Sequence, residues 1–468
     1  MKIVFVTKLL GLSSILGVSA VSLSACAAAD QIVFANYESY MSPRLESKIM
    51  EENDNVLFDY YPSNESMITN FKNGTYTIGV PSTYAIIDLI QEDGLVKIDW
   101  NKFGLKKPNN PNVRIQNSQQ ALSLFTPEVQ TLLTSFKDIG IDNLLDYCVP
   151  YFFQSYIFAY RGDEIKFNEA NPTWSQIFNF IGSSEGAQRF GPKNGKENLG
   201  AVEDERSLFS VANIVRTTDN NQPISTNPTD LAIKPTIEDY VNVFRYLSEP
   251  NRINRDTLSG NPQPIFLNSD SSVILNKLAT GALQGAFLFN GDAIFAGYGG
   301  EAEGSIEYPT GEDFHIITPK QTVYTLDAMV INKVAINKNP NTLEQAYQLL
   351  YEVGLQGSDQ DVDSFAAIYD TDVESIDEPT YINGPMDNFT YVQYTSPLNV
   401  ISGVTDSVVA NGFFDDDDAE LSKAFLKAYN IALPEGIPIQ NVIEAPLNIW
   451  QKQAIVNAWA RFKDHKWS

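Results

Sequence analysis

The chain has few of the side chains that metal centres and catalytic sites most often use. Its 468 residues include two cysteines, Cys26 and Cys148, and two histidines, His315 and His465. Neither histidine lies near a cysteine or in a metal-ligand spacing, which excludes a typical zinc site and a histidine-based triad. Cys148 lies in the apolar run LLDYCVPYFF, which predicts a buried, inert thiol. We therefore expect no metal, no disulfide and no catalytic residue.

Positive charge and phosphate-binding motifs are also scarce. The chain has 32 Lys and Arg against 58 Asp and Glu, a net charge of −26, so phosphate would be repelled and nucleic acid is not an expected partner. It contains no glycine-rich phosphate-binding loop, and we expect no cofactor. Aromatic residues are plentiful, with 27 Phe, 22 Tyr and 5 Trp, which is ample for packed cores. The length allows two or three domains.

Long apolar runs are confined to the N-terminus. Two lysines precede an apolar stretch at residues 9–23, and LSAC follows, ending at Cys26. This layout is typical of a secretory signal, and the cysteine resembles that of a bacterial lipobox. We expect residues 1–25 to be a signal peptide, Cys26 to carry lipid, and residues 26–30 to include a spacer; an uncleaved membrane anchor is the alternative. No later segment has 18 consecutive apolar residues, so we expect no further membrane span.

The first hundred residues alternate strand-like and helix-like segments. QIVFAN, VLFDYYP and TYTIGVP are typical of strands, whereas SPRLESKIMEEN, NESMITNFKNG and STYAIIDLIQEDG are typical of helices. Ser42 suits a helix N-cap and Pro43 the first helical position. This alternation predicts an α/β unit with a largely parallel sheet. Ligands bind such sheets at the carboxyl ends of strands, where ANYESY and VPSTY lie.

These segments together resemble one known family. NYESYMSPRLESKIMEEN, YPSNESM, GTYTIGVPSTY and YCVPYFFQSYIFAY are similar to segments of the spermidine/putrescine-binding proteins of ABC importers. The resemblance implies an α/β, type II periplasmic-binding-protein fold with two lobes, a hinge and a ligand cleft between them. It implies that lobe 1 comprises residues 31–147 and 323–396, and lobe 2 residues 148–322 and 397–468. It implies no enzymatic activity.

The resemblance assigns a first group of ligand-binding residues to the N-terminal unit. Tyr37 lies where the family has a tryptophan, and Tyr40 matches a family tyrosine. Glu38 replaces a threonine and adds negative charge. In VPSTY, Ser82 and Tyr84 match a serine and a tyrosine that line the family's pocket.

A second group comes from later segments. Asp204 in VEDERSLFSVAN matches one ligand carboxylate, whereas Ser207 stands where a second acid is expected. Phe289 in AFLFNGDA replaces a pocket tryptophan, and Asp327 in VYTLDAMVI matches the key amine-binding carboxylate. Tyr394 in QYTSPLN matches a pocket aromatic. Weaker correspondences concern Tyr324, Thr325 and Glu444.

Carboxylates and aromatic rings suit a flexible polyamine. A cation over a ring gains roughly 0.5–2 kcal/mol, and a buried carboxylate is costly unless a cation compensates it. We expect a monomeric, lipid-anchored protein on the outer face of the cell membrane, or its periplasmic side where an outer membrane exists. It would deliver polyamines to an ABC permease served by a separate ATPase. A binder of another organic cation, a sugar or a metal chelate, or a surface lipoprotein that lost its ligand, are the alternatives.

Other features lie outside the expected site. The acidic run 415–418 suits the cap of a helix that begins near Ala419 better than a calcium loop. Segments around 105–142, 185–200, 216–228 and 355–388 are expected to be polar surface insertions. The C-terminal LNIWQKQAIVNAWARFK has helical apolar spacing and is expected to pack on the second lobe. Its apolar positions are Trp450, Ala454, Ile455, Ala458, Trp459 and Phe462.

Overall fold

The computed structural model describes most of the chain beyond the N-terminal segment. The described residues are 30–108, 110–226, 234–249, 252–253, 264–300, 314–366, 382–402, 413–414 and 419–464. The predicted signal peptide, Cys26 and the acidic run 415–418 lie outside them. None of the helices in the described ranges is long and apolar enough to cross a bilayer.

The N-terminal unit has the expected alternation of strands and helices. In chain order it consists of β1 (Ile32–Asn36), α1 (Pro43–Glu52), β2 (Val56–Tyr60), α2 (Asn64–Lys72), β3 (Ile78–Gly79) and α3 (Thr83–Gln91). Strand β1 pairs in parallel with both β2 and β3, which confirms the parallel α/β order here. Pro43 opens α1 after Ser42, because its fixed φ suits the first helical position.

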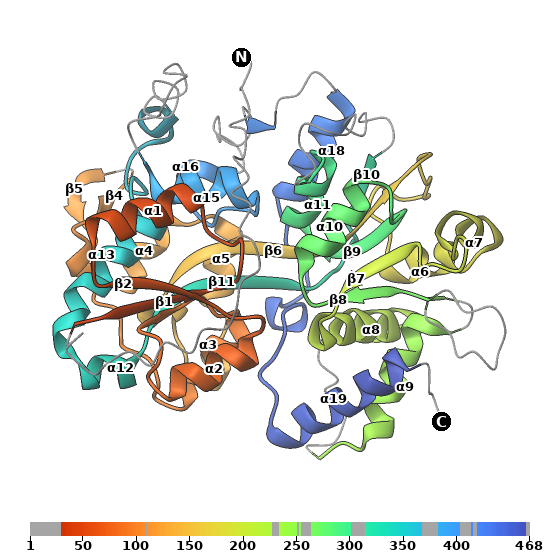
Figure 1. The fold of residues 1–468 in the computed structure, drawn as a ribbon, viewed down its shortest axis with the longest axis horizontal. Coiled ribbons are helices and arrows are strands. Elements are labelled where there is room, and N and C mark those ends of the chain that lie inside the picture. Colours follow the sequence, from red (N-terminus) through yellow and green to blue (C-terminus); the bar gives the residue numbers. More distant parts are fainter. Residues whose placement is uncertain are drawn as a thin grey trace.

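A mixed nine-stranded sheet runs through the described part of the molecule, in the order β2-β1-β3-β11-β6-β9-β7-β8, with β10 also paired to β6. The remaining strands of this sheet are β6 (Cys148–Arg161), β7 (Leu199–Val202), β8 (Phe266–Asn268), β9 (Gly285–Phe289), β10 (Phe314–Ile317) and β11 (Tyr324–Ile331). The first half of β6 pairs with β11 and its second half with β9 and β10. Figure 1 shows β6 and β11 crossing the middle of the molecule, so one sheet joins two groups of helices.

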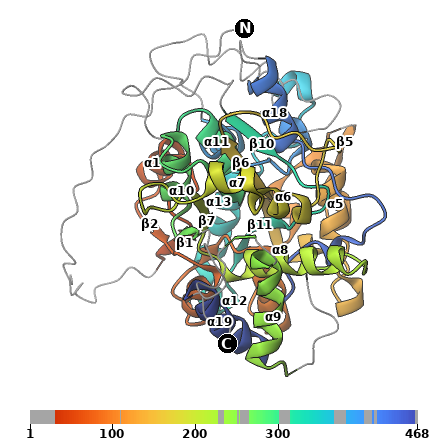
Figure 2. The same ribbon diagram turned by 90° about the vertical axis from the view of Figure 1, so that its right-hand side faces the viewer.

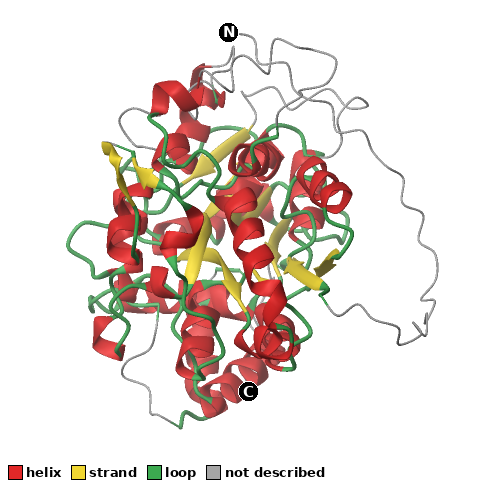
Figure 3. Ribbon diagram, turned by 90° about the vertical axis from the view of Figure 1, so that its left-hand side faces the viewer, coloured by secondary structure: helices red, strands yellow, loops and turns green. Residues whose placement is uncertain are grey.

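The two groups of helices lie on either side of this crossing in Figure 1, and Figure 2 looks onto the right-hand group. With α1–α3, the left-hand group includes α4 (Ser118–Ala121), α5 (Pro127–Leu133), α12 (Lys333–Lys338), α13 (Leu343–Gly354), α15 (Gly384–Val392) and α16 (Asn399–Ser402), beside a small hairpin of β4 (Lys106–Lys107) and β5 (Asn110–Arg114). The right-hand group contains α6 (Trp174–Ile181), α7 (Ser184–Phe190), α8 (Glu205–Asp219), α9 (Ile237–Ser248), α10 (Ser271–Ala279), α11 (Asn290–Gly297), α18 (Ala419–Tyr429) and α19 (Ile449–Lys463). In Figure 3 helices surround the strands, which places the sheet inside.

Segment 105–142 is part of the core, so its interpretation as a polar surface insertion is wrong. Its backbone is tied to a distant part of the chain, since Thr126 N–H donates to Pro397 O at 3.0 Å and Asn399 Nδ2 donates to Phe125 O at 2.8 Å. The polar residues that suggested an excursion alternate with apolar ones that this packing buries. The buried apolar residues of the segment include Leu105, Ile115, Leu124, Phe125, Val129, Leu132, Leu133 and Phe136.

The C-terminal helix packs on α8 and α9 as expected, with one exception. Trp450 is 47% exposed, and the ammonium of Lys234 lies 4.8 Å from its ring centre. Ile449 is 71% exposed, so the first turn of α19 faces solvent and burial begins only at Ala454. Helical spacing predicts a shared face but not where along the helix that face meets its partner. The buried positions are Ala454, Ile455, Ala458, Trp459 and Phe462.

Cys148 is free and buried, as predicted. Burial raises the pKa of its thiol well above the usual range, which keeps it protonated. The expectation of an inert thiol is confirmed.

Candidate functional site

Asp327 is the centre of a buried hydrogen-bond group that joins β11, β6 and the loops that follow β1 and β3. Its side chain is 4% exposed. The Tyr40 hydroxyl (2.8 Å) and Gln154 Nε2 (2.6 Å) donate to Oδ2, and Ser82 Oγ (2.6 Å) donates to Oδ1. Burial raises the pKa of Asp327 to about 6, although the three hydrogen bonds oppose that rise. All three donors are neutral, so they leave the charge of the carboxylate uncompensated.

The corner VPSTY brings Ser82 to this carboxylate. Pro81 ends the strand segment that includes β3. Ser82 is the N-cap residue of α3, but its side chain makes no capping hydrogen bond. Its backbone instead forms an isolated bridge with Asp327, and its N–H donates to Asn64 Oδ1 at 3.0 Å. Asn64 opens α2, so two helix starts and one strand converge on Asp327.

Tyrosine rings form a wall beside Asp327. The ring centre of Tyr37 lies 4.6 Å from that of Tyr61 and 5.6 Å from that of Tyr40. Tyr40 in turn lies 5.5 Å from Tyr394. Gly291 permits this position of Tyr394, since a Cβ at residue 291 would lie 2.5–2.8 Å from three of its ring atoms. The wall therefore depends on a glycine at the start of α11.

Asp292 is a second buried acid of the site, and sequence reasoning did not single it out. It lies in the first turn of α11, and its Oδ2 is buried without a hydrogen-bond partner. Burial raises the pKa of Asp292 to about 7, and the nearby hydroxyls of Tyr394 and Ser271 lower it only in part. The available signal was the acid in AFLFNGDA, three residues after the apolar run that ends at Phe289.

A third acidic group lies at the N-terminus of α8. The N-cap Asp204 accepts from the Arg206 N–H at 2.9 Å, which also lets the helix dipole favour its charge. Ser207 Oγ lies 2.6 Å from Asp204 Oδ2 and 2.9 Å from Glu444 Oε1. One hydroxyl proton serves only one of these two carboxyl groups. Burial raises the pKa of Glu444 to about 8, and the nearby charge of Asp204 adds to this rise.

Arg206 projects from the same turn of α8 onto the first group of helices. It is 6% exposed, and its guanidinium carbon lies 3.8 Å from the centre of the Tyr84 ring. Its Nε donates to Glu65 Oε1 at 3.2 Å, and the Tyr84 hydroxyl donates to the same oxygen at 3.1 Å. Sequence reasoning missed this residue. The available signal was a cation in the first turn of a helix, where the dipole disfavours it and a partner is expected.

Two further predicted residues lie on neighbouring strands of the sheet, Phe289 at the end of β9 and Thr325 on β11. The Phe289 ring lies 5.2 Å from that of Tyr156, and the charges of Asp204, Asp292 and Glu444 contribute to the raised pKa of Tyr156. Thr325 is buried on β11, two residues before Asp327. The structure thus brings together ten of the candidate residues, namely Tyr37, Tyr40, Ser82, Tyr84, Asp204, Ser207, Phe289, Asp327, Tyr394 and Glu444.

Two other candidates lie apart from this group. Tyr324 faces the opposite side of β11, where its ring stacks on Phe153 and its hydroxyl donates to Ala432 O at 3.3 Å. Glu38 is exposed, and its charge acts on Tyr60, whose pKa it helps to raise. Neither side chain joins the hydrogen bonds around the buried acids in the described structure.

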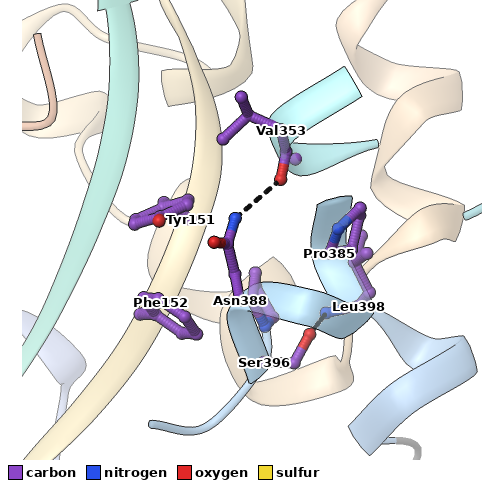
Figure 4. Close-up of a pocket in the computed structure, with 9 residues that line it drawn as sticks. Tyr151, Phe152, Val353, Pro385, Asn388, Ser396 and Leu398 are labelled. Atoms are coloured by element: carbon purple, nitrogen blue, oxygen red, sulfur yellow. Dashed lines mark hydrogen bonds between the residues drawn. The ribbon is translucent and has the colours of Figure 1, made fainter. Parts of the chain in front are cut away.

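Two small cavities lie away from these acids. The first has a volume of about 10 Å³ and lies where Asn388 Nδ2 donates to Val353 O at 3.2 Å, beside Tyr151 and Phe152 (Figure 4). It holds no more than a single water. The second, of about 370 Å³, is lined in part by Lys97 and Lys333. Neither has any of the buried acids in its lining.

A family model described as hypothetical lipoprotein (MG045 family) matches residues 1–418. The chain belongs to this lipoprotein family. Membership agrees with a membrane-associated location outside the cytoplasm, while lipid attachment at Cys26 stays a prediction.

Curated relatives are similar to this chain over a limited region. Spermidine/putrescine-binding periplasmic proteins of Salmonella typhimurium and Escherichia coli K12 are each 33% identical over 112 residues. These matches cover 20% of this chain and 32% of each relative. The chain therefore matches about a third of the length of these relatives.

Solved structures show the fold over nearly the whole chain. The spermidine/putrescine ABC transporter substrate-binding protein PotD of Streptococcus pneumoniae has 18% identity and a TM-score of 0.52, covering 93% of this chain and 99% of that one. A putative spermidine/putrescine ABC transporter protein of Listeria monocytogenes has 17% identity and a TM-score of 0.55, with the same coverage. A mannitol-bound solute-binding protein of Agrobacterium vitis S4 has 12% identity and a TM-score of 0.53, covering 93% and 94%. These structures confirm the fold of two-lobed substrate-binding proteins.

Proposed function

We propose that this protein is the substrate-binding component of an ABC importer and binds a polyamine, such as putrescine or spermidine, between its two lobes. The observation that supports this best is the set of buried acids with neutral partners beside aromatic rings. Asp327 accepts only neutral donors, and Asp292 has a buried oxygen without a donor. A ligand ammonium would supply the missing positive charge.

The aromatic residues fit the rest of such a ligand. Polyamines are methylene chains that carry ammonium groups, and ring faces attract both parts. Tyr37, Tyr40 and Tyr394 lie side by side next to Asp327. Phe289 lies at the end of β9, where its ring contacts that of Tyr156. Micromolar affinity requires only about −8 kcal/mol, which two charge-assisted hydrogen bonds and ring contacts can supply.

The proposal includes how the protein works in transport. Lobe 1 would comprise 31–147 and 323–396, and lobe 2 would comprise 148–322 and 397–468, with β6 and β11 as the connection about which they close. Closing would bury the amines and present the face that a permease binds, while a separate ATPase drives uptake. Lipid at Cys26 would hold a monomer at the outer face of the membrane.

Calorimetric titration of the full chain in mild detergent tests this function. We expect saturable binding of putrescine, cadaverine or spermidine, and no heat with mannitol or maltose, which carry no charge. Binding of a sugar without any polyamine would instead assign the same fold to another solute. Absence of heat with every polyamine at pH 7.5–8 would contradict the proposal.

A further inference from the structure

We propose that the second cavity, of about 370 Å³, binds the headgroups of anionic phospholipids and holds the protein on the membrane beside its N-terminal anchor. Its volume is typical of small-ligand sites. This inference rests on the lipid anchor in the proposed function, and it is independent of the transported ligand. A phospholipid headgroup joins a phosphate anion to the apolar carbons below it, and the cavity offers partners for both parts.

The cavity lies at the end of α3 that points away from the buried acids. Ser82, which donates to Asp327, precedes this helix, whereas Ile90 near its C-terminus lines the cavity. The helix has nine residues and is therefore about 14 Å long. Lys333 also lines the cavity, two residues after the end of β11. The cavity is thus separate from the ligand site.

The lining joins apolar side chains to cations. Lys333 Nζ lies 2.7 Å from both carboxylate oxygens of Asp93, so this pair is neutral. Lys97 is exposed, and its ammonium lies 5.5 Å from the centre of the Tyr147 ring. No carboxylate among the described residues pairs with Lys97. The lining therefore has a net positive charge, although the whole chain carries −26. Its apolar members are Ile90, Leu95, Val96 and Ile336.

Basic side chains also lie next to the cavity. Lys338 of α12 donates to a neutral partner, Asn73 O, at 2.7 Å, and the neighbouring acid Glu92 is paired with Lys72. The segment 94–114, part of which lines the cavity, has five basic residues and one acid. Charges act on an anionic bilayer surface over roughly 8 Å at physiological ionic strength. Acids farther away are screened, so these lysines decide the contact.

The described chain begins beside this cavity. Asn341 Nδ2 donates to Asp30 Oδ1 at 3.4 Å, and Asn341 lies four residues after Asn337, which lines the cavity. In Figure 1, α12 lies at the lower left, at the end of the molecule where β1 begins. Asp30 follows Cys26 by four residues, which reach at most ~14 Å when fully extended. Lipid on Cys26 would therefore hold the cavity close to the membrane surface.

The anchor makes a weak site sufficient. Once one end of the chain is tethered, binding of a headgroup is an intramolecular event at an effective concentration in the millimolar range. A cavity with two lysines and apolar walls then needs only modest affinity to stay occupied. Two attachments on the left-hand group of helices would leave the right-hand group free to close over a ligand.

Hydrogen exchange measured by mass spectrometry on the full chain, anchored through its N-terminus in vesicles, tests this docking. One set of vesicles contains phosphatidylcholine alone, and the other an equal mixture of phosphatidylcholine and phosphatidylglycerol. We expect exchange in segments 93–97 and 333–338 to be at least twofold slower on the mixed vesicles. Exchange in α7, at the opposite end of the molecule in Figure 1, should be the same on both.

Variants with matched charge separate the cavity from the rest of the surface. Lys97→Gln combined with Lys338→Gln should abolish the difference between the two kinds of vesicle, whereas arginine at both positions should keep it. Lys193→Gln combined with Lys196→Gln removes the same charge from an exposed turn after α7 and should also keep it. If the first glutamine pair shows no cooperative thermal unfolding, Lys97→Gln alone replaces it, and the difference should fall by at least half.

Equal exchange on both kinds of vesicle, or a difference that the Lys97 and Lys338 glutamine variant keeps, would overturn the inference. So would slower exchange only when glycerol 3-phosphate is added in detergent, which would assign the cavity to a soluble anion. Slowing that grows with protein concentration in detergent would assign it to a second copy of the chain, again overturning lipid docking.

The outcomes are distinguishable from those of the proposed function. Calorimetry in detergent should give the same polyamine affinity for the Lys97 and Lys338 glutamine variant as for the wild type. A wild-type chain that binds no polyamine would overturn the proposed ligand and leave lipid docking standing. A chain whose mass shows no lipid on Cys26 would overturn the anchor, and this inference with it.

Discussion

At the scale of single residues, burial and partners give the acids of this site unlike properties. Asp327 is surrounded by neutral donors, Asp292 has an oxygen without one, and burial raises the pKa of Glu444 to about 8. The family resemblance identified Asp327, and an acid is unusual in a strand such as VYTLDAMVI. They did not identify Asp292, because an acid in the first turn of a helix is ordinary for dipole reasons alone. Only the burial of its side chain distinguishes it.

Asp327→Asn should weaken polyamine binding at least about tenfold, which is ~1.4 kcal/mol. The substitution keeps the shape of the side chain but removes the charge that an ammonium requires. The melting temperature of the ligand-free protein at pH 8 should stay equal or rise, because a buried charge is removed. Calorimetry and thermal unfolding check both parts.

A matched control for this substitution is Asp93→Asn. Asp93 is 84% exposed and has a positive φ, which asparagine tolerates. Its replacement should leave polyamine affinity unchanged. Equal affinity in wild type and Asp327→Asn would remove Asp327 from the site.

At the scale of elements, local sequence signals predicted where helices begin and which face of each is apolar. They were poorer at predicting which elements pack against one another. Pro43 and the apolar spacing of α1–α3 gave their positions within a few residues. Trp450 was expected to be buried and is exposed, because spacing does not indicate where a packing partner ends. Segment 105–142 was judged by its polar residues, whereas its burial depends on a segment almost 300 residues away.

Gly291→Ala should disturb the aromatic wall although alanine is the better helix former. The new Cβ would lie 2.5–2.8 Å from the ring of Tyr394, so the ring or the start of α11 must move. We expect a loss of stability of about 1–3 kcal/mol, as for overpacked cores, together with weaker ligand binding. Urea unfolding measures the first effect and calorimetry the second.

A double-mutant cycle provides the control for this prediction. Tyr394→Leu removes the ring that the added methyl group meets, so Gly291→Ala should cost less in that background. Additive losses in the two variants would show that residue 291 acts through something other than Tyr394.

At the scale of the whole molecule, the buried acids link stability to pH. Burial raises the pKa of Asp327 to about 6, of Asp292 to about 7 and of Glu444 to about 8. Between pH 4 and 8 the folded state therefore holds more protons than the unfolded state. Because stability then falls as pH rises, the ligand-free protein should be most stable near pH 4 to 5 and less stable at pH 8. The net charge of −26 acts in the same direction.

Thermal unfolding of the ligand-free protein at pH 5 and pH 8 measures this dependence. Glu444→Gln should reduce the difference between the two melting temperatures, since glutamine cannot ionise. A bound polyamine should also reduce it, because its ammonium groups favour the ionised carboxylates that dominate at pH 8. A wild-type melting temperature that is higher at pH 8 than at pH 5 would contradict the prediction.

The sequence by itself determined the class of fold, the order of its first six elements, the inert Cys148 and most of the residues that meet at the site. The order of the elements and the inert thiol follow from local rules, because strand and helix periodicity, proline and caps act over a few residues. The two-lobed fold and the site residues follow from the resemblance to the spermidine/putrescine-binding proteins. Only the tertiary structure decided which charges are compensated. Arg206 meets Tyr84 and Glu65 across 122 and 141 positions of the chain, a contact that no local rule predicts. Burial and electrostatic pairing are properties of neighbours in space, which the order of residues does not list.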